Sequence, residues 1–137
     1  MKNIAVIGAG ISGLFIANLF KRNPDYNITV YEKNSSITLE KGYGIQLSVN
    51  SIKLLNKIGF EKLQNEGKFF PEKINFYSNN NFTKICELDI SDFNSEDCKY
   101  TTLKRSNLIN FLKKDLVNII KTDYNISKID QIDKQIK

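Results

Sequence analysis

Residues 4–20 read IAVIGAGISGLFIANLF, a run of 17 residues without a charged side chain. Such a run at the start of a chain is either a signal or membrane segment, or the beginning of a nucleotide-binding fold. A helix that spans a membrane needs about 20 mostly apolar residues, whereas this run is shorter and contains three glycines, a serine and an asparagine. A secretory signal would end in a small-residue cleavage site, but this run continues directly into Lys21, Arg22, Asn23 and Pro24. The positions of the glycines favour the second interpretation.

The three glycines follow the spacing G-x-G-x-x-G, at Gly8, Gly10 and Gly13. The apolar residues 4–7 before them predict a strand buried on both faces, and residues 14–20 are compatible with a helix packed on a sheet. In this arrangement Gly8 makes the tight turn out of the strand, Gly10 leaves room for a pyrophosphate, and Gly13 lets the helix pack closely on the strand. The N–H groups at the start of the helix then face the phosphates.

The residues that follow complete the predicted strand–helix–strand unit. Pro24 ends the helix, and residues 28–31 read as the second strand. Glu32 closes that strand 19 residues after Gly13, where a carboxylate can accept hydrogen bonds from a ribose 2′-OH. An acidic residue at this position disfavours a 2′-phosphate, so FAD or NAD is expected here in preference to NADP. The fold class predicted from this unit is α/β, with a Rossmann-like dinucleotide-binding start.

Composition excludes several other classes of function. The net charge of +5 comes from residues spread along the chain, and 18 of the 20 basic residues are Lys; a nucleic-acid interface would show clustered basic residues. The chain has no histidine, so neither a His-containing zinc site nor a Ser-His or Cys-His pair can be built, and no metal is expected. Cys86 and Cys98 fit no metal or redox motif and are expected to be free, buried or half-buried thiols. Nothing requires an oxidising compartment or a transmembrane segment, and a cytoplasmic location is expected.

The rest of the chain predicts short alternating elements. Gly59 is expected to end a helix over residues 48–58, and residues 73–78 and 82–88 flank three asparagines as a β-hairpin. Ser106 is expected to cap a helix that covers Leu108 to Ile119. The remaining predicted elements are an extended segment at residues 42–47, one or two helical turns at 60–67, a polar loop at 34–41, an irregular segment at 91–99, a strand at 100–103, and extended structure around Ile126, Ile129 and Ile132 before a turn at 133–134.

Three motifs resemble the N-terminal part of class A FAD-dependent monooxygenases, the aromatic-ring hydroxylases that include salicylate hydroxylase-like enzymes. The first is VIGAGISGL at residues 6–14 together with Glu32 and Lys33. The second, GYGIQLSVNSIKLLNKIGF at residues 42–60, is more specific, although Val49 stands where family members often have proline. The third is LKRSNLINFL at residues 103–112, which is similar to the family's arginine-containing entry to a long helix.

The resemblance implies a cofactor site and a domain plan. The predicted FAD-binding residues are Gly8, Gly10, Ile11, Ser12, Gly13, Glu32, Lys33 and Arg105. Arg105 would contact FAD near the pyrophosphate and ribityl chain, and planar contact with phosphate suits a guanidinium; a surface arginine in a local salt bridge is the alternative. Residues 1–137 would form the N-terminal part of an FAD-binding domain, with the dinucleotide-binding unit at about 1–33 and a hairpin excursion from the substrate-domain side at about 73–103. The three-layer fold would be incomplete, because the family's other FAD motifs are expected beyond Lys137.

The implied function is FAD binding within a flavoprotein monooxygenase that uses NAD(P)H and O2 to hydroxylate an aromatic or similar apolar small molecule. No residue is assigned as a catalytic acid or base, and the sequence leaves open whether the full-length protein forms a homodimer. One alternative is another FAD-dependent oxidase or reductase, or an NAD-binding dehydrogenase domain, which would continue with regular strand–helix units instead of a hairpin. A second alternative is an inactive or non-enzymatic nucleotide-binding module.

Overall fold

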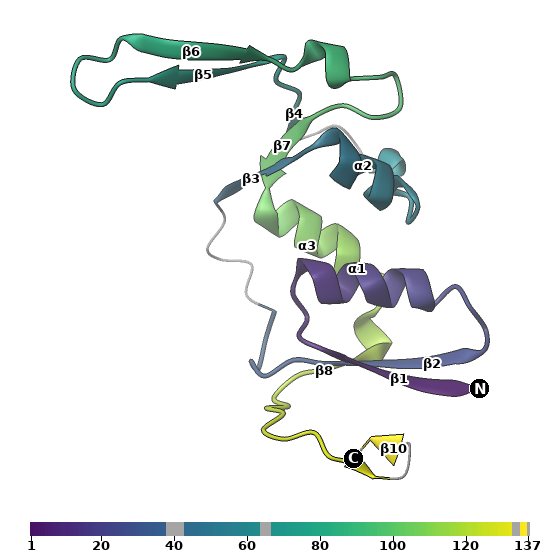
Figure 1. Cartoon of the computed structure of the whole chain (residues 1–137). Coiled ribbons are helices and arrows are strands. Elements are labelled where there is room, and N and C mark those ends of the chain that lie inside the picture. The colour runs from purple at the N-terminus through teal and green to yellow at the C-terminus, as the bar shows by residue number, and fades with distance from the viewer. Residues whose placement is uncertain (38–42, 64–66, 133–134, 137) are drawn as a thin grey trace. The chain divides into compact units, whose positions relative to one another are not determined.

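The computed structural model describes residues 1–37, 43–63, 67–132 and 135–136 (Figure 1). The chain divides into two compact units: unit 1 comprises Met1–Glu40 with Ile109–Lys137, and unit 2 comprises Lys41–Leu108. Within the described ranges, no helix has both the length and the apolar character needed to cross a membrane.

Unit 1 is built on a parallel sheet. Strand β1 (Lys2–Ile7) leads through the glycine loop into helix α1 (Ile11–Phe20), and strand β2 (Tyr26–Tyr31) returns beside β1, with Ile4 opposite Ile28. A short third strand, β8 (Ile120–Lys121), pairs in parallel with the other edge of β2 and gives the order β1-β2-β8. Two neighbouring parallel strands joined by a helix, with the third strand beyond the second, form the first half of a Rossmann sheet. The predicted α/β, Rossmann-like fold is therefore confirmed.

The core of unit 1 lies between α1, the sheet and the segment that precedes β8. Its fully buried side chains include Leu14 and Ala17 from α1, Val30 from β2, and Leu112 and Leu116. Asn18 fixes this packing, because its Nδ2 donates to the carbonyl oxygens of Leu14 at 2.9 Å and Leu112 at 2.7 Å. The side chain of Lys21 also donates to the carbonyl oxygen of Asp115. Two segments almost a hundred residues apart in the sequence thus form one small core.

Unit 2 contains an antiparallel sheet of strands β3 (Gly44–Leu47), β7 (Thr101–Lys104) and β4 (Lys68–Phe69), in the order β3-β7-β4. Helix α2 (Val49–Asn56) buries Ile52 and Leu55, which lie three residues apart on one helical face. The left-handed Gly59, with φ of 91°, ends this helical region, and its N–H donates to the carbonyl oxygen of Asn56. The predicted glycine stop is confirmed, and a single 3₁₀ turn, η1 (Phe60–Lys62), follows it.

Strands β5 (Lys73–Tyr77) and β6 (Lys84–Asp89) form the predicted antiparallel hairpin, with Ile74 opposite Leu88 and Phe76 opposite Cys86. These four residues share one apolar face, because side chains alternate along a strand. The other face is charged, and Lys73 lies 2.9 Å from Glu87, which also pairs with Lys84 at 3.0 Å. Both cysteines are free and Cys98 is half-buried, but Cys86 is exposed, contrary to expectation, since no described residue of β6 is covered.

Some predicted boundaries were wrong. Helix α3 (Arg105–Lys113) begins at Arg105, so Ser106 lies inside the helix and does not cap it. Strand β7 runs directly into α3, and the N–H of Arg105 already donates to the carbonyl oxygen of Tyr43 at 3.1 Å. The helix also ends before Ile119, which belongs to a 3₁₀ turn, η3 (Val117–Ile119).

The structure of the segments outside the main elements agrees only in part with the structure predicted from the sequence. A 3₁₀ turn, η2 (Ser91–Phe93), interrupts the irregular segment, and Ile126 and Ile129 lie in no regular element. Strands β9 (Gln131–Ile132) and β10 (Gln135–Ile136) pair in antiparallel fashion. The turn expected at 133–134 and the end of the polar loop expected at 34–41 lie outside the described residues.

Candidate nucleotide-binding site

The loop between β1 and α1 begins with Gly8, whose backbone conformation requires glycine. Its φ of +95° lies in the left-handed region that side-chain-bearing residues rarely adopt. The N–H of Gly8 donates to the carbonyl oxygen of Tyr31 at 2.7 Å, which extends the β1–β2 ladder by one bond. The chain then turns away from the sheet toward the start of α1.

Gly13 is required for a different reason, namely close packing within the loop. A Cβ atom at this position would lie 2.0 Å from the carbonyl oxygen of Gly8 and 3.3 Å from the Cγ1 of Val6. The first distance is far below any real carbon–oxygen contact, and the obstructing atom belongs to the backbone. The first turn of α1 therefore lies directly against the end of β1, as the spacing of the glycines predicts.

Gly10 is required by neither of these effects. Its φ of −76° and ψ of −179° are ordinary extended values that any residue adopts. A Cβ atom added to Gly10 would meet no described protein atom within 4 Å. Among the described residues the space in front of Gly10 is therefore open.

The start of α1 is well suited to hold an anion. The first N–H groups of a helix have no acceptor within the helix, and here they belong to the first residues of α1, including Ile11, Ser12 and Gly13. Gly10 provides no side-chain cap, and the first turn of α1 contains no acidic residue. The positive end of the helix dipole is thus not compensated by a neighbouring carboxylate on its own helix, which favours a bound phosphate.

Glu32 lies next to this loop, where β2 ends. Its Oε2 accepts a hydrogen bond from the N–H of Ala9 at 2.8 Å, which ties the carboxylate directly to the glycine loop. Its Oε1 accepts two more, from the N–H of Asn34 at 3.0 Å and from the Nδ2 of Asn34 at 2.8 Å. Burial acts to raise the pKa of Glu32, but the hydrogen bonds from Asn34 and Ala9 and the charge of Lys33 together lower this pKa below its ordinary value of 4.5.

The chain after β8 holds the Glu32 backbone in place. The N–H of Glu32 donates to the carbonyl oxygen of Lys121 at 2.8 Å, and the carbonyl oxygen of Glu32 accepts from the N–H of Tyr124 at 2.9 Å. The rings of Tyr31 and Tyr124 lie 5.4 Å apart, with the Nζ of Lys121 5.8 Å from each ring centroid. The sequence analysis did not predict that Lys121 and Tyr124 lie beside Glu32. The strand that brings them there, β8, has only two residues, and two consecutive isoleucines at 119 and 120 are its only local signal.

The structure brings together seven of the eight residues predicted to bind FAD. Residues 8–13 and Glu32 meet in unit 1, and Lys33 adjoins Glu32 with an exposed side chain. Arg105 belongs to unit 2, where it is the first residue of α3. Its contact with the same cofactor therefore stays a prediction.

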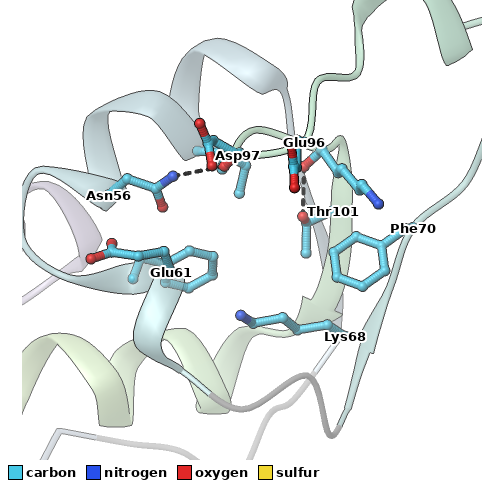
Figure 2. Close-up of a pocket in the computed structure, with 10 residues that line it drawn as sticks. Asn56, Glu61, Lys68, Phe70, Glu96, Asp97 and Thr101 are labelled. Atoms are coloured by element: carbon cyan, nitrogen blue, oxygen red, sulfur yellow. Dashed lines mark hydrogen bonds between the residues drawn. The ribbon is translucent and has the colours of Figure 1, made fainter.

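Unit 2 contains a separate pocket of about 270 Å³, with residues of α2, η1, β4 and β7 in its wall (Figure 2). The Nδ2 of Asn56 donates to the carbonyl oxygen of Asp97 at 2.9 Å, while its buried Oδ1 has no hydrogen-bond partner among the described residues. Burial lowers the pKa of Lys68, whose Nζ donates to the carbonyl oxygen of Leu63 and lies 4.6 Å from the centroid of the Phe60 ring. A water molecule would satisfy Asn56 here, so the pocket needs no larger ligand.

Comparison with known proteins agrees with this geometry. Residues 6–40 match the family described as NAD(P)-binding Rossmann-like domain. A stretch of 69 residues is 38% identical to 6-hydroxynicotinate 3-monooxygenase of Pseudomonas fluorescens, and covers 50% of this chain and 17% of that protein.

Among solved structures, 2,6-dihydroxypyridine-3-hydroxylase of Arthrobacter nicotinovorans superposes with a TM-score of 0.75 at 16% identity, over 98% of this chain and 32% of its own. HpxO of Klebsiella pneumoniae, solved with FAD and uric acid, superposes with a TM-score of 0.74 at 18% identity, over 98% of this chain and 34% of its own. The predicted resemblance to FAD-dependent monooxygenases is confirmed. This chain spans about a third of the length of these solved relatives.

Proposed function

We propose that this chain binds the adenosine diphosphate part of FAD, with the pyrophosphate on residues 8–13 and the ribose on Glu32. The observation that carries the proposal is the open space at Gly10. Gly8 is explained by its backbone conformation and Gly13 by packing, whereas at position 10 neither backbone strain nor a clash with the described residues calls for glycine, which fits a ligand that approaches the backbone. The start of α1 directly follows Gly10 and has no acidic residue in its first turn, so its N–H groups would attract that ligand's phosphates.

Glu32 selects the kind of nucleotide. Its carboxylate is ionised at neutral pH, as for any glutamate whose pKa is not raised, so it accepts hydrogen bonds from ribose hydroxyls and repels a 2′-phosphate. FAD and NAD fit this requirement, and NADP does not. Lys33 beside it is proposed to contact the same nucleotide, and Arg105 is proposed to contact the FAD pyrophosphate or ribityl chain.

The relatives support a proposal about the wider activity. We propose that the chain works within a flavoprotein monooxygenase that uses NAD(P)H and O2 to hydroxylate an aromatic or similar small molecule. Bound flavin would supply the oxygen chemistry, while the protein binds it, orients it and excludes water. A dinucleotide-binding part at about residues 1–33, a hairpin excursion at about 73–103 and a cytoplasmic location belong to the same proposal.

The second candidate is an NAD-binding dehydrogenase domain, which the match to an NAD(P)-binding Rossmann-like family favours. A dehydrogenase would be expected to continue after β2 with regular strand–helix units. Here the chain continues instead with unit 2, whose strands β3, β4 and β7 are antiparallel, and with the β5–β6 hairpin. FAD binding is therefore the better explanation.

The substitution Gly10→Val tests the proposal. Because Gly10 has an ordinary φ and open space around it, valine should leave the melting temperature nearly unchanged while its side chain fills the phosphate's approach. We expect the affinity for ADP, measured by isothermal titration calorimetry, to fall at least about tenfold, or ~1.4 kcal/mol. Gly44→Val in β3 is the matched control, since its Cβ would meet only the Cγ2 of Thr102, at 4.0 Å. Unchanged ADP binding by Gly10→Val would refute the assignment of the loop.

A further inference from the structure

We infer that Glu32 accepts a hydrogen bond from only one ribose hydroxyl, and that Asn34 is the positioning residue that imposes this limit. The inference rests on the proposed function, because it concerns the nucleotide held by the same site. It specifies which part of the ligand the carboxylate recognises, and it names a residue that the glycine spacing does not indicate.

The limit comes from counting acceptor positions. An ionised carboxylate has about four positions for hydrogen bonds, two on each oxygen. On Oε1 both are filled, by the N–H of Asn34 at 3.0 Å and by the Nδ2 of Asn34 at 2.8 Å. On Oε2 one is filled, by the N–H of Ala9 at 2.8 Å. One position therefore remains for a ligand, and it lies on the oxygen that faces the glycine loop.

The donors that fill these positions are themselves held in place. Ala9 is only 3% exposed, and its N–H follows directly from the left-handed Gly8. The carbonyl oxygen of Asn34 accepts a hydrogen bond from the N–H of Asp123 at 3.1 Å, and the backbone of Glu32 is bonded to Lys121 and Tyr124. Rotating the carboxylate to free Oε1 would break its bonds to both Asn34 and Ala9.

Protonation does not offer another way to bind a second hydroxyl. A protonated carboxyl group could donate to a hydroxyl oxygen, whereas an ionised one only accepts. The pKa of Glu32 is lowered, and Lys33 adds a neighbouring positive charge. At neutral pH the carboxylate is therefore an acceptor with a single open position.

Asn34 sets the limit because its side chain fills the second position on Oε1. Without that side chain, Oε1 keeps only the backbone N–H of Asn34 and regains an open position. Asn34→Ala should therefore let Glu32 accept from a second ribose hydroxyl. Ser35→Ala, next in sequence and also exposed, is the matched control, since Ser35 makes no bond to Glu32 among the contacts of the described residues.

Binding of ADP, 2′-deoxy-ADP and 3′-deoxy-ADP to the 137-residue chain tests the inference. In the wild-type background we expect Glu32→Ala to weaken ADP about tenfold, the scale of one charge-assisted hydrogen bond. The same loss should persist with one deoxy analogue and disappear with the other. In the Asn34→Ala background the loss caused by Glu32→Ala should be larger with ADP, and it should be smaller than that with each deoxy analogue but abolished with neither. Ser35→Ala should behave as wild type.

Two results would overturn the inference in different ways. If Glu32→Ala still weakens binding of both deoxy analogues in the wild-type background, ADP binding stands and the single-hydroxyl limit is wrong. If the wild-type chain does not bind ADP at all, the proposed function fails and this inference fails with it.

A measurement without nucleotide tests the geometry itself. In the free wild-type chain, the amide protons of Ala9 and Asn34 and the side-chain amide of Asn34 should all shift with one common midpoint as Glu32 titrates, in NMR spectra recorded from pH 7 to pH 3. The common midpoint should move upward in Asn34→Ala, which a merely structural role would not produce. Independent midpoints, or no response at Asn34, would overturn the assignment.

Discussion

At the scale of single residues, the structure requires glycine at two of the three loop positions, and the proposed ligand accounts for the third. Gly8 adopts a left-handed φ, Gly13 lies against the carbonyl oxygen of Gly8, and Gly10 faces open space. Gly8 and Gly13 are thus explained by backbone conformation and by packing, and Gly10 is proposed to leave room for a ligand. Substitutions at these positions should separate stability from binding.

Gly13→Ala should destabilise the protein. The added Cβ would lie 2.0 Å from a backbone oxygen, so either α1 or the end of β1 must move. Forced overpacking of this kind costs about 1–3 kcal/mol, and chemical denaturation followed by circular dichroism measures that loss. Gly10→Ala, for which no clash exists, is the matched control and should stay within about 0.5 kcal/mol of wild type. Equal stability of Gly13→Ala and wild type would mean that the loop and α1 are not packed as described.

Glu32 should make stability depend on pH. Its folded-state pKa lies below the ordinary value of 4.5, so its ionised form is favoured by folding. That contribution is fully present above pH 4.5 and is lost as the pH falls through the folded-state pKa. The free energy of unfolding, measured from pH 7 to pH 3 for wild type and Glu32→Gln, should therefore show a difference that is constant at neutral pH and shrinks in acid. A difference that does not vary with pH would contradict the hydrogen bonds assigned to the carboxylate.

At the scale of elements, the β5–β6 hairpin differs from the β1–β2 pair. The hairpin has no buried residue, whereas Val30 of β2 is completely buried. A two-stranded hairpin is only marginally stable in water without a packed face, and here the apolar face of Ile74, Phe76, Cys86 and Leu88 is largely exposed. Local opening of this element should therefore require little free energy.

Hydrogen exchange should show this contrast directly. Backbone amides of β5 and β6 are expected to exchange with low protection, and the amides of β1 and β2 that face each other should be among the best protected. Both sets lie in strands of five or six residues, so strand length does not explain the difference. Protection of the hairpin equal to that of β2 would mean that another surface covers its apolar face.

The elements also show how far the sequence determines the structure. The glycine loop, α1, β2 and Glu32 follow from local patterns, because each residue's role is set by near neighbours in the chain. The hairpin and Gly59 are predictable for the same reason. Strands β4 and β8 have two residues each and depend on partners distant in sequence, so no alternation could indicate them. Tyr124 reaches the site because β8 pairs with β2. Asn34 reaches it through a side-chain hydrogen bond to Glu32, two residues away, which the sequence pattern alone does not predict.

At the scale of the whole molecule, the glycine loop, Glu32 and Lys33 all belong to unit 1, whereas Arg105 belongs to unit 2. The β1-β2-β8 sheet brings the glycine loop, Glu32 and residues 121–124 to the carboxyl ends of its parallel strands, where ligands bind in open α/β sheets. The chain spans about a third of the length of its solved relatives, and no described residue is assigned to the flavin ring. Because residues 8–13 and Glu32 are proposed to hold the pyrophosphate and the ribose, we expect the chain to recognise the adenosine diphosphate half of FAD.

Titration of the 137-residue chain with the two halves of FAD separates recognition of adenosine diphosphate from recognition of the flavin. ADP carries the ribose and phosphates that Glu32 and the start of α1 would hold, whereas FMN carries the flavin ring, the ribityl chain and one phosphate. Isothermal titration calorimetry of wild type should show saturable binding of ADP and FAD with similar affinity, and binding of FMN at least about tenfold weaker, or ~1.4 kcal/mol. Binding of FMN as tight as ADP, or no binding of ADP, would contradict the account.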